Sequence, residues 1–375
     1  MALAYALAGA VLVLAILGEA FEALVLPRRV TRRFRFARYY YRVAWRAWTA
    51  AADLLPPGHR RETVLSVFGP LSLLCLFALW AAGLILGFGL LHHAAAPRDG
   101  GLAESVYFSG VTFTTIGYGD IAPAGWMSRT LAIVEGGTGF GFFAVVISYL
   151  PVLYQAFSRR ESLIGVMDAR AGSPPSAARI LLRLPPGPGD GAIIGRLLED
   201  AERWAAEVLE AQLSFPVLGY YRSQHDNQSW LAAMVCTLDL SALLLTVADG
   251  VDRRQSRLTF AMCRHTLVDL SLVLWQPPRE GTLDRLSEAR LRELLGALRA
   301  AGVAVRDDPG AAAKLTELRG LYEPFAAALA AYFRLTVPDV WPDGDRPDNW
   351  QTSAWMRRAG PLTALGADRP DDHFT

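Results

Sequence analysis

The feature that most constrains this fold is a long uncharged run, since no charged side chain occurs between Glu62 and His92. At about 1.5 Å rise per residue, a helix over this run can cross a hydrocarbon core roughly 30 Å thick. Residues 2–18 are as apolar, and residues 127–157 carry only two charges. The sequence therefore predicts an all-α membrane protein with three transmembrane helices, which accounts for an apolar share of 52%.

The arginines indicate which side of the membrane each loop occupies. Residues 27–62 hold ten arginines against two acids, and Arg159 and Arg160 follow the third apolar segment. Because such charge gathers on the cytoplasmic side, we expect a multi-pass plasma (inner) membrane protein with its N-terminus outside and its C-terminus in the cytoplasm. A cleaved signal peptide is the alternative for the first segment, but no basic side chain precedes its apolar run.

Between the first two apolar segments, cations alternate with aromatic side chains in the run Arg33–Arg42, which continues to Trp48. Nucleic-acid binding is one interpretation, but no fold that would present these side chains is evident. A basic amphipathic linker lying on anionic inner-leaflet lipids fits the pattern better. We therefore expect membrane lipids, and no nucleic acid, as the partners of residues 27–62.

A seven-residue run, Thr-Thr-Ile-Gly-Tyr-Gly-Asp at 114–120, lies in the loop between the second and third apolar segments. A Gly-Tyr-Gly-Asp turn alone would be ordinary loop chemistry. Gly117 and Gly119 can, however, adopt backbone angles that turn successive carbonyl groups to one side. The preceding residues 103–113 are too short to span the membrane and predict a re-entrant helix, which is tolerated at that depth only inside protein.

This run, its re-entrant helix and its flanking segments resemble the pore of bacterial two-helix potassium channels, over about residues 63–157. Pro123, Arg129 and Gly139 also match that family by their offsets from the run. The resemblance implies that carbonyl oxygens hold K⁺ in a selectivity filter. It implies filter residues Thr115, Ile116, Gly117, Tyr118 and Gly119, with filter support from Thr114, Asp120, Tyr107 and Val111. Val111 stands where some relatives carry a carboxylate, and Tyr107 is the candidate partner of Asp120.

The third apolar segment has features of a gate. Gly139 falls at the position of that family's hinge glycine, and three more glycines lie within a turn and a half. Close packing against the re-entrant helix is the other explanation for these glycines. By their offset from the filter, bulky side chains and a proline are expected to face the conduction path, namely Phe140, Phe143, Ile147 and Pro151. We expect Glu135 to hydrogen-bond near the re-entrant helix, through Thr112 or Thr138, because an unpaired acid is costly there.

Residues 158–375 change to an Ala, Leu, Arg and Glu-rich composition broken by Pro and Gly. Helical periodicity predicts an α-helical cytoplasmic regulatory or assembly domain with an irregular tail after Pro338. Helices are expected over 175–183, 190–213, 228–249, 255–275, 283–302 and 309–335. The apolar stretch 229–248 is a buried core helix or a fourth membrane helix, and Asp239 near its middle favours the core helix. Ser229 or Asn227 is expected to cap that helix.

The sequence therefore predicts four parts: an N-terminal transmembrane helix (1–26), a basic cytoplasmic linker (27–62), a pore module (63–157) and a cytoplasmic domain (158–375). We expect a potassium-selective channel that is not an enzyme and needs no cofactor, with K⁺ as the permeant ion. One filter strand cannot surround an ion, so a homotetramer follows. The alternatives are a signalling or scaffold protein whose cytoplasmic domain is the active part, and a weakly selective cation channel. The three cysteines are expected to be buried free thiols.

Overall fold

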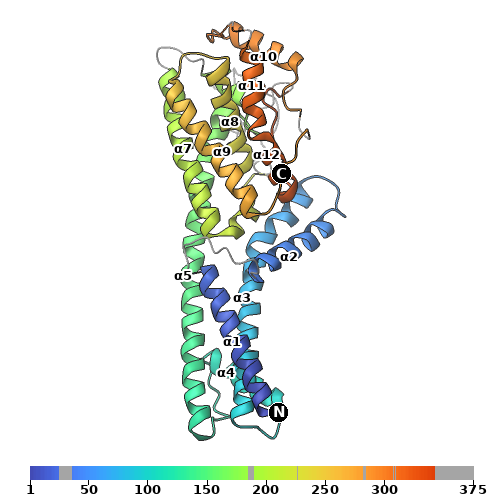
Figure 1. The fold of residues 1–375 in the computed structure, drawn as a ribbon, viewed down its shortest axis with the longest axis vertical. Coiled ribbons are helices and arrows are strands. Elements are labelled where there is room, and N and C mark those ends of the chain that lie inside the picture. Colours follow the sequence, from blue (N-terminus) through green and yellow to red (C-terminus); the bar gives the residue numbers. More distant parts are fainter. Residues whose placement is uncertain are drawn as a thin grey trace, which may run out of the picture. The chain divides into compact units, whose positions relative to one another are not determined.

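The computed structural model describes residues 1–24, 36–184, 190–225, 227–281, 284–306, 308 and 310–342. Within these ranges the chain is helical, and its only β-type pairing is an isolated antiparallel bridge between Ala248 and Val305 (Figure 1). Three helices are long and apolar enough to cross a membrane: α1 (Ala2–Leu24), α3 (His59–Ala95) and α5 (Gly125–Ala171). The predicted all-α class with three such helices is confirmed.

The chain divides into two compact units, Met1–Gln155 and Ala156–Thr375. Part of the basic loop (25–35), the linker residues 185–189 and the tail (343–375) lie outside the described residues. The predicted irregular conformation of the tail therefore stays a prediction.

In the first unit, α3 is the central helix, and α1, α2 (Phe36–Ala52) and α4 (Gly101–Phe113) pack against it. Glycine allows α1 and α3 to approach closely: a methyl group on Gly9 would lie 2.6 Å from the Gly87 carbonyl oxygen. Val13 packs beside this contact in a buried cluster with Leu84, Phe88 and Phe113. The second half of α3 thus contacts both α1 and the re-entrant helix α4.

Helix α2 occupies the predicted amphipathic linker. It buries Trp45 against Phe68 of α3, with ring centroids 4.8 Å apart. Trp48 Nε1 donates to the Val64 carbonyl oxygen at 2.9 Å, so an aromatic side chain also satisfies a polar group on α3. The opposite face exposes large apolar side chains, among them Tyr39. The amphipathic helix is present, and its contact with lipid stays a prediction.

The second unit is built around α8 (Trp230–Thr246), which is buried along almost its whole length. Around it lie α6 (Ala177–Arg183), α7 (Asp190–Ser214), η1 (Pro216–Tyr220), α9 (Arg253–Val273), α10 (Glu288–Ala300), α11 (Ala311–Gly320) and α12 (Glu323–Phe333). The core-helix interpretation of this apolar segment is confirmed. Ser229 caps α8, its Oγ accepting from the Ala232 N–H at 3.0 Å, as predicted.

Two sequence predictions were wrong, one in each unit of the chain. The single helix expected over 309–335 is interrupted at Leu321–Tyr322, because α12 starts anew with Pro324 in its first turn. Cys75 is exposed on α3, whereas Cys236 and Cys263 are buried as expected. The short helix η1 was not predicted.

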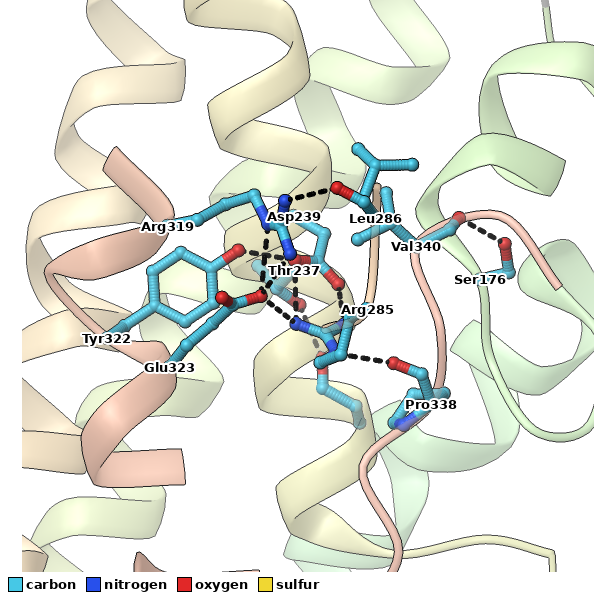
Figure 2. A network of polar contacts seen from close by, with 11 residues as sticks. Ser176, Thr237, Asp239, Arg285, Leu286, Arg319, Tyr322, Glu323, Pro338 and Val340 are labelled. Atoms are coloured by element: carbon cyan, nitrogen blue, oxygen red, sulfur yellow. Dashed lines mark hydrogen bonds and ion pairs between the residues drawn. The ribbon is translucent and has the colours of Figure 1, made fainter. Parts of the chain in front are cut away.

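A buried polar network closes the second unit around Asp239 of α8 (Figure 2). Arg285 donates to both carboxylate oxygens of Asp239, to Glu323 Oε1 at 3.0 Å and to the Pro338 carbonyl oxygen at 2.7 Å. Tyr322 donates its hydroxyl hydrogen to Asp239 as well. Burial is the largest influence on the pKa of Arg285 and lowers it, but Asp239, Tyr322 and Glu323 together raise this pKa by more, so the guanidinium keeps its charge. The network joins α8 to α12, to the segment between α9 and α10 that carries Arg285, and to the segment after α12 that carries Pro338.

Candidate functional site

The candidate site starts where α4 ends. Thr115, Gly117 and Gly119 have φ values of 60°, 62° and 79°, so every second residue of the run lies in the left-handed region. Such alternation turns successive carbonyl groups toward the same side of the strand. Glycine adopts this conformation without penalty, whereas a β-branched threonine at φ 60° is strained. The strain at Thr115 was not foreseen from the sequence.

Backbone hydrogen bonds join residues 114–120, called the strand below, to the last turn of α4. The Ile116 and Gly117 N–H groups approach the Val111 carbonyl oxygen at 3.0 and 3.4 Å, and Thr114 Oγ1 donates to the Gly110 carbonyl oxygen at 2.6 Å. Val111 therefore contacts the strand through its carbonyl group, since its side chain has no hydrogen-bonding atom. Tyr118 is 70% exposed in the single chain, so this side of the strand is open to other molecules.

At the far end of the strand, Tyr107 of α4 donates its hydroxyl hydrogen to Asp120 Oδ2 at 2.8 Å. This is the partner that the sequence suggested for Asp120. The bond joins the middle of the re-entrant helix to the residue that follows the Gly-Tyr-Gly sequence.

Glu135 is completely buried between three helices. Its Oε2 lies 2.9 Å from His92 Nε2 of α3, and its Oε1 is hydrogen-bonded to Ser109 Oγ of α4. The predicted partners were wrong, because Thr112 and Thr138 donate to carbonyl oxygens of their own helices, each at 2.8 Å. The acid does bond near the re-entrant helix, through Ser109 one turn earlier.

Helix α5 runs without interruption past Gly139 and Pro151. A methyl group on Gly139 would lie 1.9 Å from the Phe113 carbonyl oxygen, so this glycine lets α5 touch the end of α4. Close packing against the re-entrant helix is therefore present at Gly139, and a hinge there stays a prediction. Phe140 and Ile147 are 72% and 70% exposed, seven residues apart on one face of α5.

Because of this contact, alanine substitution should have a much larger effect at Gly139 than at the neighbouring Gly141. Gly139→Ala is expected to reduce ion flux at least about tenfold, because displacing the Phe113 carbonyl moves the residues that hold the strand. Gly141→Ala is the matched control, since a methyl group there meets no atom within 4 Å in the same chain. Flux into liposomes at equal protein density is the measurement. Equal flux from the two variants would contradict the packing role.

A family model described as ion channel matches residues 73–155, from the middle of α3 to the middle of α5. These residues form an ion-channel domain. The domain includes α4 and the strand 114–120, and the three helices long enough to span a membrane make the chain a membrane protein. The first helix, α1, lies outside the matched segment.

Two bacterial proteins are similar to parts of the chain. The membrane protein YdjJ of Bacillus subtilis (strain 168) is 25% identical over 181 residues, which cover 46% of this chain and 52% of YdjJ. Protein LctB of Geobacillus stearothermophilus is 34% identical over 85 residues, which cover 18% of this chain and 63% of LctB. The chain therefore spans between half and two thirds of the length of these relatives. No solved structure matches the chain.

Within the ion-channel domain, sequence reasoning missed His92 and Ser109 as partners of Glu135. His92 ends the uncharged run of the second apolar segment, and Glu135 is an acid inside the third. An ionisable residue in each of two neighbouring membrane helices is a signal for pairing.

Proposed function

We propose that the protein is a potassium-selective channel that conducts K⁺ passively across the plasma membrane. The observation that carries the proposal is the left-handed backbone at every second residue of 115–119, directly after a re-entrant helix of an ion-channel domain. A row of aligned carbonyl oxygens can replace the hydration shell of K⁺. The ion would be held by Thr115, Ile116, Gly117, Tyr118 and Gly119. Thr114, Asp120, Tyr107 and Val111 would support that strand.

Four copies would form the pore, since each chain contributes one strand and a ring of carbonyls needs several. The exposure of Tyr118 and Ile116 in the single chain supports this assembly. So does α9, whose inner face is buried in the second unit while Leu258, Ala261, His265 and Leu272 are exposed and Val268 is partly buried on its other side. Their spacing of three and four residues is that of a helix seam that packs against copies of itself. The cytoplasmic domain would thus assist assembly.

The gate would lie on α5. Phe140, Phe143, Ile147 and Pro151 recur at helical spacing along one face of α5, and each is exposed in the single chain. Bulky apolar side chains around a narrow path exclude water and ions when they approach one another. With residues 27–62 in the cytoplasm, the strand 114–120 would face outward, and the N-terminus would lie outside.

Potassium flux into liposomes that contain the purified full chain tests the proposal. We expect K⁺ uptake that barium blocks, with little uptake of Na⁺ under the same conditions. The particle in detergent should have the mass of four chains. Equal uptake of sodium and potassium would favour a weakly selective cation channel. No flux of either ion would leave the scaffold alternative, in which the cytoplasmic domain is the active part.

A further inference from the structure

The buried contact set around Glu135 determines where its hydrogens lie. Ser109 Oγ is within hydrogen-bonding distance of two oxygen atoms, Glu135 Oε1 and the Ile85 carbonyl oxygen, the latter at 2.7 Å. A hydroxyl group carries one hydrogen and can donate it once, while a carbonyl oxygen can only accept. For both contacts to be hydrogen bonds, the one to Ile85 must use the hydrogen of Ser109. The contact between Ser109 and Glu135 then needs a hydrogen from the carboxyl group.

The contacts on the other side of the carboxyl group account for the remaining hydrogens of the cluster. His92 Nε2 faces Glu135 Oε2 at 2.9 Å, and His92 Nδ1 faces Ser128 Oγ at 3.4 Å. A neutral imidazole that is protonated at Nε2 donates to Glu135 and accepts from Ser128. Each contact then holds one hydrogen, and the cluster carries no net charge. With Glu135 ionised and His92 protonated, the Ser109 and Ile85 oxygens would lack a hydrogen for one of their contacts.

We propose that Glu135 is a protonated carboxylic acid at neutral pH, the middle of an uncharged hydrogen-bond chain from His92 of α3 through Ser109 of α4 to the Ile85 carbonyl group. Glu135 is thereby a positioning residue for the re-entrant helix, because one side chain of α5 joins α3 to α4. Burying a neutral acid with both oxygens bonded costs far less than burying an ion. Its effect on flux rests on the proposed channel function, whereas its protonation does not.

The other ionisable groups near the cluster, among the described residues, have contacts of their own. Tyr107 bonds Asp120, Glu104 accepts from the Gly100 N–H, and the Arg98 guanidinium lies 4.4 Å from the centroid of the Phe108 ring. His93 Nδ1 lies 3.4 Å from Ser105 Oγ, and its ring packs edge-on to Tyr5 of α1. Arg129 of α5 is exposed. His92 and Ser109 are therefore the side chains that face the carboxyl group.

Infrared spectroscopy tests the protonation directly. The carbonyl stretch of a protonated carboxylic acid is separate from the bands of carboxylates, so the difference spectrum of wild type and E135Q at neutral pH should contain it. The matched control is E104Q, which removes a partly buried acid of α4 that has no contact with the cluster and should leave the band in place. If the spectra of wild type and E135Q differ only in carboxylate bands, the proposal is overturned, whatever the flux.

Flux measurements distinguish the uncharged hydrogen-bond chain from an ion pair between Glu135 and His92. A glutamine amide can donate to Ser109 and accept from His92, as the protonated acid does, whereas alanine leaves both unpaired. We expect E135A to lower flux at least about tenfold and E135Q to restore most of that loss. Above the pH at which Glu135 ionises, wild-type flux should fall while E135Q flux does not. If E135Q loses as much flux as E135A, His92 is a cation that needs a carboxylate, and the proposal is wrong.

Discussion

Replacing Gly117 by alanine is expected to abolish potassium-selective flux. Gly117 has a φ of 62°, and a side chain in that conformation costs about 1–2 kcal/mol per residue. A methyl group on Gly117 meets no atom of its own chain within 4 Å, so the penalty is conformational rather than a clash. The strand can relieve it only by rotating the peptide groups on either side. In a four-chain pore that rotation would remove four carbonyl oxygens from each adjoining ion site.

Gly110→Ala is the matched control for this substitution. Gly110 is a helical residue of α4, where a methyl group makes only an ordinary contact of 3.7 Å with Ile85. Alanine also stabilises a helix by about 1 kcal/mol relative to glycine. Liposome flux of potassium and sodium should therefore be lost in Gly117→Ala and kept in Gly110→Ala. Unchanged selectivity in Gly117→Ala would refute the assignment of residues 115–119 as the filter.

Asp239→Ala is expected to destabilise the second unit by about 3–5 kcal/mol. The side chains of Asp239 and Arg285 are each 2% exposed, so removal of the carboxylate leaves a guanidinium charge in the interior. Tyr322 loses the acceptor of its buried hydroxyl group at the same time. Glu323 remains beside Arg285, but it also accepts from Arg319 and cannot replace a bidentate partner.

The control is another aspartate–arginine pair in the same unit. Asp249 pairs with Arg306, but its side chain is 52% exposed, and Arg306 also donates to carbonyl oxygens of α8. Asp249→Ala should therefore cost at most about 1 kcal/mol. Thermal unfolding of the full-length chain in detergent, followed by circular dichroism, measures both variants. Equal shifts in the two variants would show that the buried network contributes no more than a surface pair.

The helices of this protein could be predicted where composition and periodicity agree. The uncharged run before His92 determines α3, and the buried pattern of α8 follows from an apolar segment that contains one acid. The break between α11 and α12 was missed because the periodicity continues across it. A tertiary contact accounts for the helix break, because Tyr322 at the break is completely buried and its hydroxyl group donates to Asp239 of another helix.

The candidate site was predictable where neighbours in the sequence make the contacts. Tyr107 and Asp120 are 13 residues apart, joined by the second half of α4 and the strand, so their pairing could be foreseen. Ser109 and Glu135 come from different helices, and their contact depends on the rotation of each helix about its axis. Ser109 and Thr112 are both hydroxyl residues of α4, and no local pattern distinguishes them. The left-handed φ of Thr115 was equally hidden, because a β-branched residue seldom adopts it.

The tight contact between α1 and α3 has a practical consequence for work on the isolated pore. The matched domain starts at residue 73, so a truncated chain that begins there would lack α1. The backbone around Gly87 and the side chain of Leu84 would then face lipid or detergent instead of Gly9 and Val13. Lipid tails cannot follow a glycine-lined helix surface as closely as another helix does. The smallest stable pore from this chain should therefore retain its first helix.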